Sequence, residues 1–398
     1  MIVGLLIAAL QIGTSLARLA GFAFAVLTIG RIGGDPNLLL VIGYLPYLAF
    51  FDILIQSGSR AMHLQGGPAR SSWAAWRAGY AMAALAAIGA CIMVIASNPA
   101  ARYLLVLGAW PLGALGFIWE RWIARRNRQV LLSTAELTIL AAAVGVYLAG
   151  LASWSALLLC IVSAPLARLA VLALPNARAQ ATETTGAEPI VDGPPASRRR
   201  LGGYVAASLA QQLLGASAAS LPALYAQAFG DYRGLSVNLA AFRSLHSLAA
   251  VLSLSINAMS SRIFYRQMGG AFASMERLAL GKAAPVAVFA CAATIAAAVI
   301  AILQPSQPVL FSAALLPIMA AINTESSMLY NRGLPFWTMH CQAMILLLSA
   351  AFLAMLTGYA PAALVALAVF LGYGALAFPR MINAHRQEIA YDRIVADA

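Results

Sequence analysis

Charged side chains are scarce in this chain. They make up 10% of its 398 residues, whereas an ordinary soluble domain holds about 25%. Acidic residues are the rarer sign, 13 against 25 basic residues, and Lys282 is the single lysine. With 62% hydrophobic residues, so few charges cannot coat a soluble core of this size. The composition therefore excludes a soluble enzyme, a secreted disulfide scaffold, a disordered protein and, despite the basic balance, a nucleic-acid binder.

Motifs that carry chemistry are scarce as well. The four cysteines (Cys91, Cys160, Cys291 and Cys341) lie in four separate apolar runs without metal or disulfide spacing, so we interpret them as packing residues. No phosphate loop surrounds Lys282, and no His/Glu metal motif is present. The sequence predicts neither an enzyme nor a cofactor.

Long apolar runs recur from end to end, and a run of about 18 or more such residues is typical of a membrane helix. The first run lacks a basic start and is too long for a signal peptide, so we expect an uncleaved membrane helix. We predict an all-α polytopic membrane protein with about twelve spans: 2–30, 38–55, 73–96, 103–123, 130–150, 154–174, 201–229, 235–263, 283–303, 309–330, 335–357 and 360–378.

The basic residues test this topology, because Lys and Arg concentrate in cytoplasmic loops. With the N-terminus placed in the cytoplasm, 19 of the 25 lie in cytoplasmic segments or at their edges, three in external loops and three inside spans. This alternation predicts an even number of spans, with both termini cytoplasmic.

One segment interrupts the apolar pattern. Residues 175–200 are rich in Pro, Gly, Thr and Ala, which indicates a cytoplasmic linker. It divides the chain into two predicted six-helix lobes, 1–174 and 201–378, followed by a cytoplasmic tail, 379–398.

The two lobes share short motifs. The turn IGGDPN (Ile32–Asn37) matches AFGDYRG (Ala228–Gly234), and the basic exit SGSRAMHLQGG (Ser57–Gly67) matches MSSRIFYRQMGG (Met259–Gly270). Because both lobes start inside, the repeat would be parallel, with a pseudo-twofold axis along the membrane normal. Transporters built from such repeats bind substrate between them. The alternative is chance similarity of short strings.

The stretches Leu16–Gln65 and Ser220–Gln267 resemble the MOP flippase superfamily, in its polysaccharide (Wzx-like) branch. The family pattern is a first helix ending in a Gly-rich turn, followed by a second helix with a small-residue-plus-Arg exit like Ser57–Arg60. The resemblance implies a transporter that flips a lipid-linked oligosaccharide across the bacterial cytoplasmic membrane by alternating access. It implies partners among membrane lipids and glycan polymerase or assembly proteins. A cation-coupled exporter of the MATE branch and a polyprenol-dependent glycosyltransferase or polymerase are the alternatives.

Charged residues at membrane depth are costly and therefore candidates for function. Arg18 in the first span and Arg243 in the eighth belong to different lobes, and two guanidiniums would suit a diphosphate. Gln211 and Gln212 could bind sugar hydroxyls. The alternatives are arginines paired within their own lobes and glutamines that bond between helices.

Other polar residues are candidates for coupling or gating. Glu136 and Arg168 lie at matching depth on adjacent spans, which predicts a structural ion pair or a gate. Glu325 and His340, with Gln342 near them, predict a proton or cation site or a plain hydrogen-bond network. The remaining two candidates are His246, one turn from Arg243, and Asp52, near the inner end of the second span.

Overall fold

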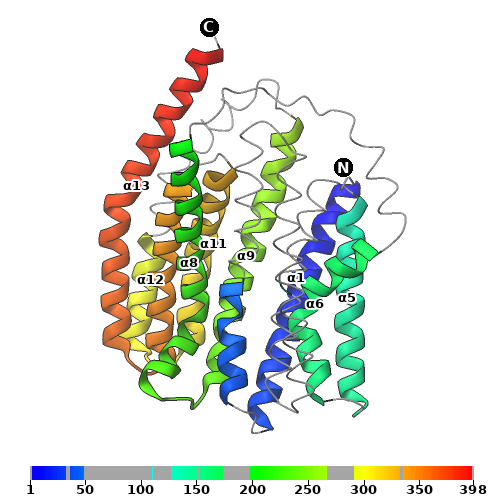
Figure 1. Cartoon of the computed structure of the whole chain (residues 1–398). Helices are drawn as coiled ribbons and strands as arrows, with labels where there is room; N and C mark the ends of the chain where they lie inside the picture. The colour runs from blue at the N-terminus through cyan, green and yellow to red at the C-terminus, as the bar shows by residue number, and fades with distance from the viewer. Residues whose placement is uncertain are drawn as a thin grey trace. The chain divides into compact units, whose positions relative to one another are not determined.

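The computed structural model describes residues 2–32, 36–48, 110, 127–150, 153–173, 198–266, 291–331 and 335–396. Within these residues the chain is helical apart from short turns (Figure 1). The predicted third and fourth spans, the end of the second span with Asp52, and the start of the ninth lie outside the described residues.

The helices follow the apolar runs of the sequence. Except at the end of the last one, their bounds lie within a few residues of the predicted spans. The labelled helices are α1 (Ile2–Arg31), α5 (Asn127–Leu148), α6 (Ser153–Ala173), α8 (Arg198–Phe229), α9 (Leu235–Arg266), α11 (Pro308–Asn331), α12 (Pro335–Leu356) and α13 (Ala360–Ala396). Two shorter apolar helices span Pro36–Leu48 and Cys291–Leu303.

Six of the described helices are long and apolar enough to cross a membrane. The apolar stretches are Ile12–Arg31, Leu131–Leu148, Leu235–Ser253, Pro308–Ser326, Phe336–Leu356 and Ala360–Ala377. Helix α8 is not among them, because it begins with three arginines and carries Gln211 and Gln212 in its middle. The prediction of an all-helical membrane protein is confirmed for the described residues.

Two predicted boundaries need correction. Arg198–Arg200 were placed in the linker, but they form the first turn of α8. The predicted tail is not separate from the last span, because α13 continues as one helix through Pro379 to Ala396. Pro379 is the one helix-breaking residue in this stretch, and residues 380–396 favour helix by their own propensity.

Glycines close the turns between helices. Gly230 and Gly234, at φ of 65° and 69°, bound the turn between α8 and α9, where left-handed backbone would strain other residues. Inside this turn, Asp231 Oδ1 accepts a hydrogen bond of 3.1 Å from the backbone N–H of Arg233. The GDYRG motif is therefore a compact turn with its own internal bond.

The contacts divide the chain into two compact units. The first unit consists of residues 1–216 and 222–244, and the second of residues 217–221 and 245–398. This division cuts across α8 and α9, whereas the predicted lobes meet in the linker, so the two-lobe organisation stays a prediction.

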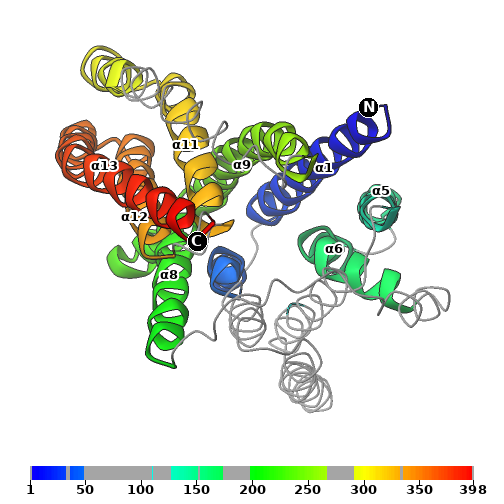
Figure 2. The same cartoon turned by 90° about the horizontal axis from the view of Figure 1, so that it is seen from above.

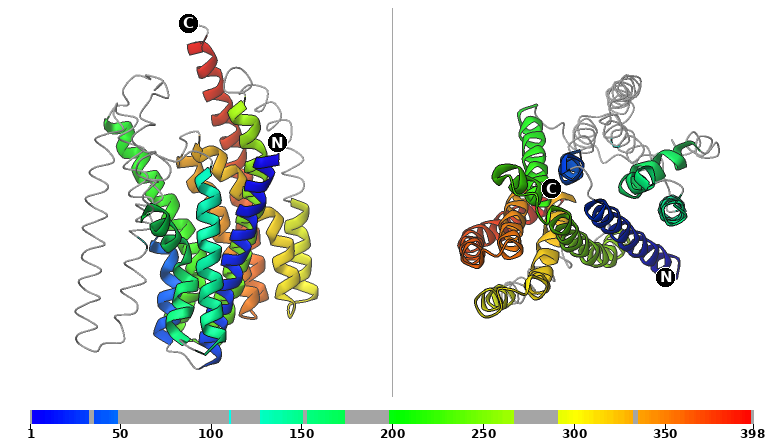
Figure 3. Two further views of the ribbon diagram at one scale, coloured as in Figure 1. Left: turned by 90° about the vertical axis from the view of Figure 1, so that its right-hand side faces the viewer. Right: turned by 90° about the horizontal axis from the view of Figure 1, so that it is seen from below.

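In the first unit, α1 packs against both α5 and α6, which also pack against each other (Figures 1 and 3). Its core joins α1, α5 and α6 to the helix Pro36–Leu48 and to the residues that flank the α8–α9 turn. The buried side chains include Ala25, Val26, Ile29, Leu39, Ile42, Leu45, Leu140, Leu157, Cys160, Ala226, Leu235 and Leu239.

In the second unit, α12 packs against both α11 and α13 (Figure 2). Large apolar side chains fill the space between these helices. The largest fully buried ones are Phe311, Leu315, Ile318, Met319, Met344 and Leu348.

Candidate functional site

A bidentate ion pair joins α1 to α5. The Nε of Arg18 donates to Glu136 Oε1 at 2.5 Å, and its Nη2 donates to Oε2 at 2.6 Å. Both carboxylate oxygens are thus engaged by one edge of the guanidinium. Parallel bonds of this kind are short, strong and selective for orientation, so they hold Arg18 in one pose.

The two partners differ in exposure. The side chain of Arg18 is 42% exposed, whereas that of Glu136 is 6% exposed. The carboxylate therefore lies behind the guanidinium, against the α1–α5 interface, and the guanidinium keeps an open side.

A second arginine reaches the same part of α1. The guanidinium carbon of Arg243, on α9, lies 5.4 Å from the ring centroid of Phe22. Phe22 is one turn after Arg18, so both side chains project from one face of α1. Arg18 and Arg243 are also close enough for their like charges to interact. The cluster of Arg18, Phe22, Glu136 and Arg243 thus brings two cations close together, and one of them, Arg18, is paired with a carboxylate.

The partner predicted for Glu136 was Arg168, and this prediction missed Arg18. Helices α5 and α6 are neighbours, as expected, but the bidentate pair of Glu136 is made across the α1–α5 interface. Matching depth on consecutive spans says nothing about which side of α5 the carboxylate occupies. Arg168 is half-buried on α6. Arg18 is thus paired within its own predicted lobe, which was the alternative to a binding role, but part of its guanidinium stays exposed.

Helix α8 carries unsatisfied polar groups. Within the part of the chain that is described, Ser208 Oγ, Gln211 Oε1 and Ser220 Oγ are buried without a hydrogen-bond partner. Ser208 and Gln211 are three residues apart and share a helix face. Buried polar atoms are nearly always bonded, so this face needs donors from water or from a ligand. Gln212 is half-buried.

The polar candidates of the second unit have local partners. His340 Nδ1 is hydrogen-bonded to the hydroxyl of Tyr373 on α13, and the His340 ring also lies 4.9 Å from that of Phe336 and 5.5 Å from that of Trp337. His246 Nε2 lies 3.0 Å from Ser349 Oγ. These histidines are tied into helix–helix contacts.

Glu325 and Gln342 lie on the neighbouring helices α11 and α12. Gln342 Nε2 donates to Ser326 Oγ at 3.2 Å, which links α12 to α11. Glu325 precedes Ser326, is half-buried and acts electrostatically on Cys341, the neighbour of Gln342. The structure thus brings Glu325 and Gln342 to the α11–α12 interface, whereas the hydrogen bond of His340 reaches α13.

Phe22, Ser349 and Tyr373 were not among the site residues predicted from the sequence. Phe22 could have been found from its spacing, because a residue four positions from a membrane arginine shares its face. Ser349 and Tyr373 had no such signal, since each lies on a different helix from the histidine that it contacts.

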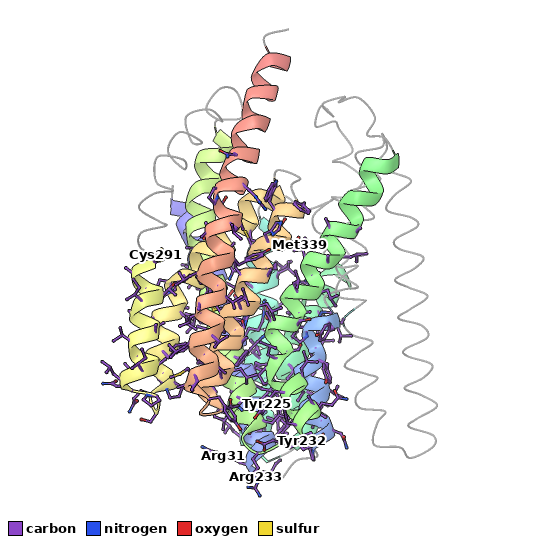
Figure 4. All side chains as sticks on the ribbon, turned by 90° about the vertical axis from the view of Figure 1, so that its left-hand side faces the viewer. Arg31, Tyr225, Tyr232, Arg233, Cys291 and Met339 are labelled. Carbon is purple, nitrogen blue, oxygen red and sulfur yellow. The ribbon has the colours of Figure 1, made fainter. Side chains whose placement is uncertain are left out.

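Close backbone contacts lie near one end of the first unit. A methyl group added at Gly30 would lie 2.2 Å from Ser236 Oγ, and one added at Gly43 would lie 2.5 Å from the Cβ of Ala223. Tyr44 donates a hydrogen bond to Gln227 in the same region. Figure 4 shows Arg31, Tyr225, Tyr232 and Arg233 gathered at this end.

Among the described residues, no group of three His, Cys, Asp or Glu side chains could hold a metal ion. Cys160 and Cys341 are buried, and Cys291 is exposed. Asp52, the remaining candidate for coupling, lies outside the described residues.

Comparisons with protein-family models, with curated proteins and with solved structures give no match. The resemblance to the MOP superfamily therefore rests on the motifs of residues 16–65 and 220–267 alone.

Proposed function

We propose that this chain is a membrane transporter that flips a lipid-linked, polyprenyl-diphosphate oligosaccharide to the external leaflet of a bacterial cytoplasmic membrane. The observation that carries the proposal is the convergence of Arg18 and Arg243 on one face of α1, where Glu136 pairs with Arg18. Two guanidiniums and one carboxylate leave a net positive charge, which is costly at membrane depth unless an anion shares the site.

A diphosphate has the chemistry that such a site would bind. Guanidinium groups grip phosphate oxygens through two parallel N–H bonds, and their charge persists at any physiological pH. The apolar surroundings strengthen these contacts, because water competes for them less than it does at a surface.

The proposed architecture has twelve spans in two six-helix lobes related by a parallel pseudo-twofold axis. Two contacts support it. Gly30 of α1 approaches Ser236 of α9, and Gly43 of the helix after α1 approaches Ala223 of α8. In such a repeat, α1 would correspond to α8 and the helix Pro36–Leu48 to α9. The twofold axis would then relate the contact of α1 with α9 to the contact of α8 with the helix Pro36–Leu48. The proposed transport is by alternating access of these lobes.

The unsatisfied face of α8 supports a role in holding the sugar part. A glycan presents many hydroxyl groups, which both donate and accept. Ser208 Oγ and Gln211 Oε1 are buried acceptors, and such hydroxyls would satisfy them when the helices packed against this face move apart during alternating access. Gln212, the next residue, would add an amide to the same helix.

Coupling to an ion gradient is proposed for the second unit. Glu325 and His340 are half-buried groups that could take up a proton there, and His246 bonds to α12 through Ser349. Arg168 and Asp52 remain candidates for gating on the basis of sequence.

The alternatives predict different substrates. A cation-coupled exporter of small molecules would place a cationic substrate beside Arg18 and Arg243, where like charges repel it. A polyprenol-dependent glycosyltransferase or polymerase would change the sugar chain rather than move it.

The test is transport by the purified full chain in liposomes that contain a polyprenyl-diphosphate disaccharide. A glycosidase added outside cleaves the disaccharide in the outer leaflet, and transport makes the inner pool accessible with time. We expect transport by the wild type, none by the Arg18→Ala/Arg243→Ala double variant, and normal transport by Arg233→Ala, which removes an exposed arginine at the α8–α9 turn. Liposomes with wild-type protein that expose no more substrate than empty ones would refute the function. An active double variant would refute the site.

A further inference from the structure

The geometry points to a positioning role for Glu136, which deepens the proposed function and rests on it. We propose that Glu136 holds the Nε–Nη2 side of the Arg18 guanidinium (the side edge). The opposite Nη1–Nη2 end of the guanidinium (the end edge) would then face a phosphate group of the substrate. The carboxylate would then stay bound to Arg18 while the substrate binds.

The donor count of Arg18 allows both contacts at once. A guanidinium has five N–H donors in a fixed plane. Glu136 uses the Nε–H and one Nη2–H, which form the side edge. The other Nη2–H and the two Nη1–H groups remain, and one hydrogen from each nitrogen forms a second fork at the end of the group. This second fork matches two phosphate oxygens as well as the first matches a carboxylate.

The exposure of the two groups argues against displacement of Glu136. A carboxylate that competes with the substrate should lie on the open side of Arg18, where the substrate arrives. Glu136 instead is 6% exposed, and the open side belongs to the 42% exposed arginine. Displacing the carboxylate would leave a buried charge without its cation, which is strongly unfavourable.

Arg243 completes the arrangement from another helix. Its guanidinium carbon lies over the ring of Phe22, 5.4 Å from the centroid, and a cation–π contact engages the charge rather than a hydrogen-bond acceptor. Phe22 and Arg18 share one face of α1, so both guanidiniums lie beside the same helix. Arg18 is held by a carboxylate and Arg243 lies over a ring, so each would keep N–H donors for one phosphate of a diphosphate.

The positioning role and a purely electrostatic role predict opposite effects of Glu136→Gln on anion binding. Removing a negative charge beside an anion site should by itself strengthen anion binding. If Glu136 positions Arg18, Glu136→Gln should instead weaken it, because a neutral amide cannot accept both bonds and the end edge loses its orientation.

The experiment measures binding of farnesyl diphosphate and of farnesyl monophosphate to the full chain in lipid nanodiscs. We expect Glu136→Gln to weaken diphosphate binding about tenfold, the effect of losing one charged hydrogen bond. The preference for diphosphate over monophosphate should fall with it, which a general loss of folded protein would not produce. Asp231→Asn is the matched control, since it removes the same charge at the α8–α9 turn, and its binding should equal that of the wild type.

Glu136→Asp keeps the ion pair but draws Arg18 back by one methylene length, so it tests positioning even if Glu136→Gln does not fold. We expect it also to lose preference for the diphosphate. Unchanged or tighter diphosphate binding by a folded Glu136 variant would overturn the positioning role, provided that Arg18→Ala and Arg243→Ala still weaken binding. If those two variants bind as the wild type does, the proposed substrate site itself is wrong.

Discussion

Replacing Arg18 by methionine should destabilise the chain more than replacing Glu136 by methionine. In Arg18→Met the carboxylate of Glu136, 6% exposed, loses its cation, whereas in Glu136→Met the 42% exposed arginine keeps an open side. Breaking a buried pair by removing one partner costs about 3–5 kcal/mol. Because water in the proposed binding site would screen the exposed side of Arg18, we expect about 2–3 kcal/mol for Arg18→Met.

The Arg18→Met/Glu136→Met double variant completes a mutant cycle. Replacing both members of a buried pair by apolar side chains of similar volume is often neutral, so the double variant should be more stable than Arg18→Met. At about 2–4 °C per kcal/mol for a large domain, the single variant should unfold about 5–10 °C lower than the wild type.

Thermal unfolding can be followed with a thiol-reactive dye in a Cys91→Ser/Cys291→Ser background, which leaves Cys160 and Cys341 as the reporting thiols. Cys160 and Cys341 are buried and become reactive when the helices separate, whereas Cys291 is exposed and would react before unfolding. The reasoning would be refuted if the two single variants lost equal stability, or if the loss in the double variant equalled the sum of the two single losses. Either result would mean that the buried charge of Glu136 does not need Arg18 as its counter-ion.

Three further predictions concern other contacts. Gly30→Ala should lower the unfolding temperature because its methyl group would collide with Ser236, and Ser236→Gly should restore it; failure of this rescue would show that the collision is not the cause. Ser208→Ala should stabilise the chain by up to about 1 kcal/mol in the same dye assay, because it removes a buried hydroxyl without a partner; a clear loss of stability would mean that the hydroxyl is bonded through water. Tyr373→Phe should lower the free energy of unfolding by about 1 kcal/mol, because it removes the hydrogen bond to His340. In a Tyr373→Phe background, His340→Ala should cost only its lost packing, and fully additive losses would contradict a shared bond.

The apolar runs predicted where the helices lie, because the length of a run and its turn residues are local properties. The turn at Gly230–Gly234 shows this, since its glycines and Asp231 are sufficient to place it.

The partners of these residues were not readable from the sequence. The side of α5 on which Glu136 lies depends on how α5 packs against α1 and α6, and this is set by side chains such as Leu140 and Leu157 that are far apart in sequence. The same reason explains why Tyr373 and Ser349 were missed as partners of the histidines. Pairing across helices is a tertiary property, and a single sequence constrains it weakly.

The length of α13 has a practical consequence. A helix of 37 residues is about 55 Å long, whereas the hydrocarbon layer of a bilayer is about 30 Å thick. Roughly 25 Å of the helix therefore projects beyond the hydrocarbon as a rod, past Pro379, where one backbone N–H is missing. A rod of this kind magnifies small rotations at its base into displacements at its tip. Energy transfer from a fluorophore placed near Ala396 to an acceptor in the lipid would thus report the tilt of α13 during the proposed transport cycle.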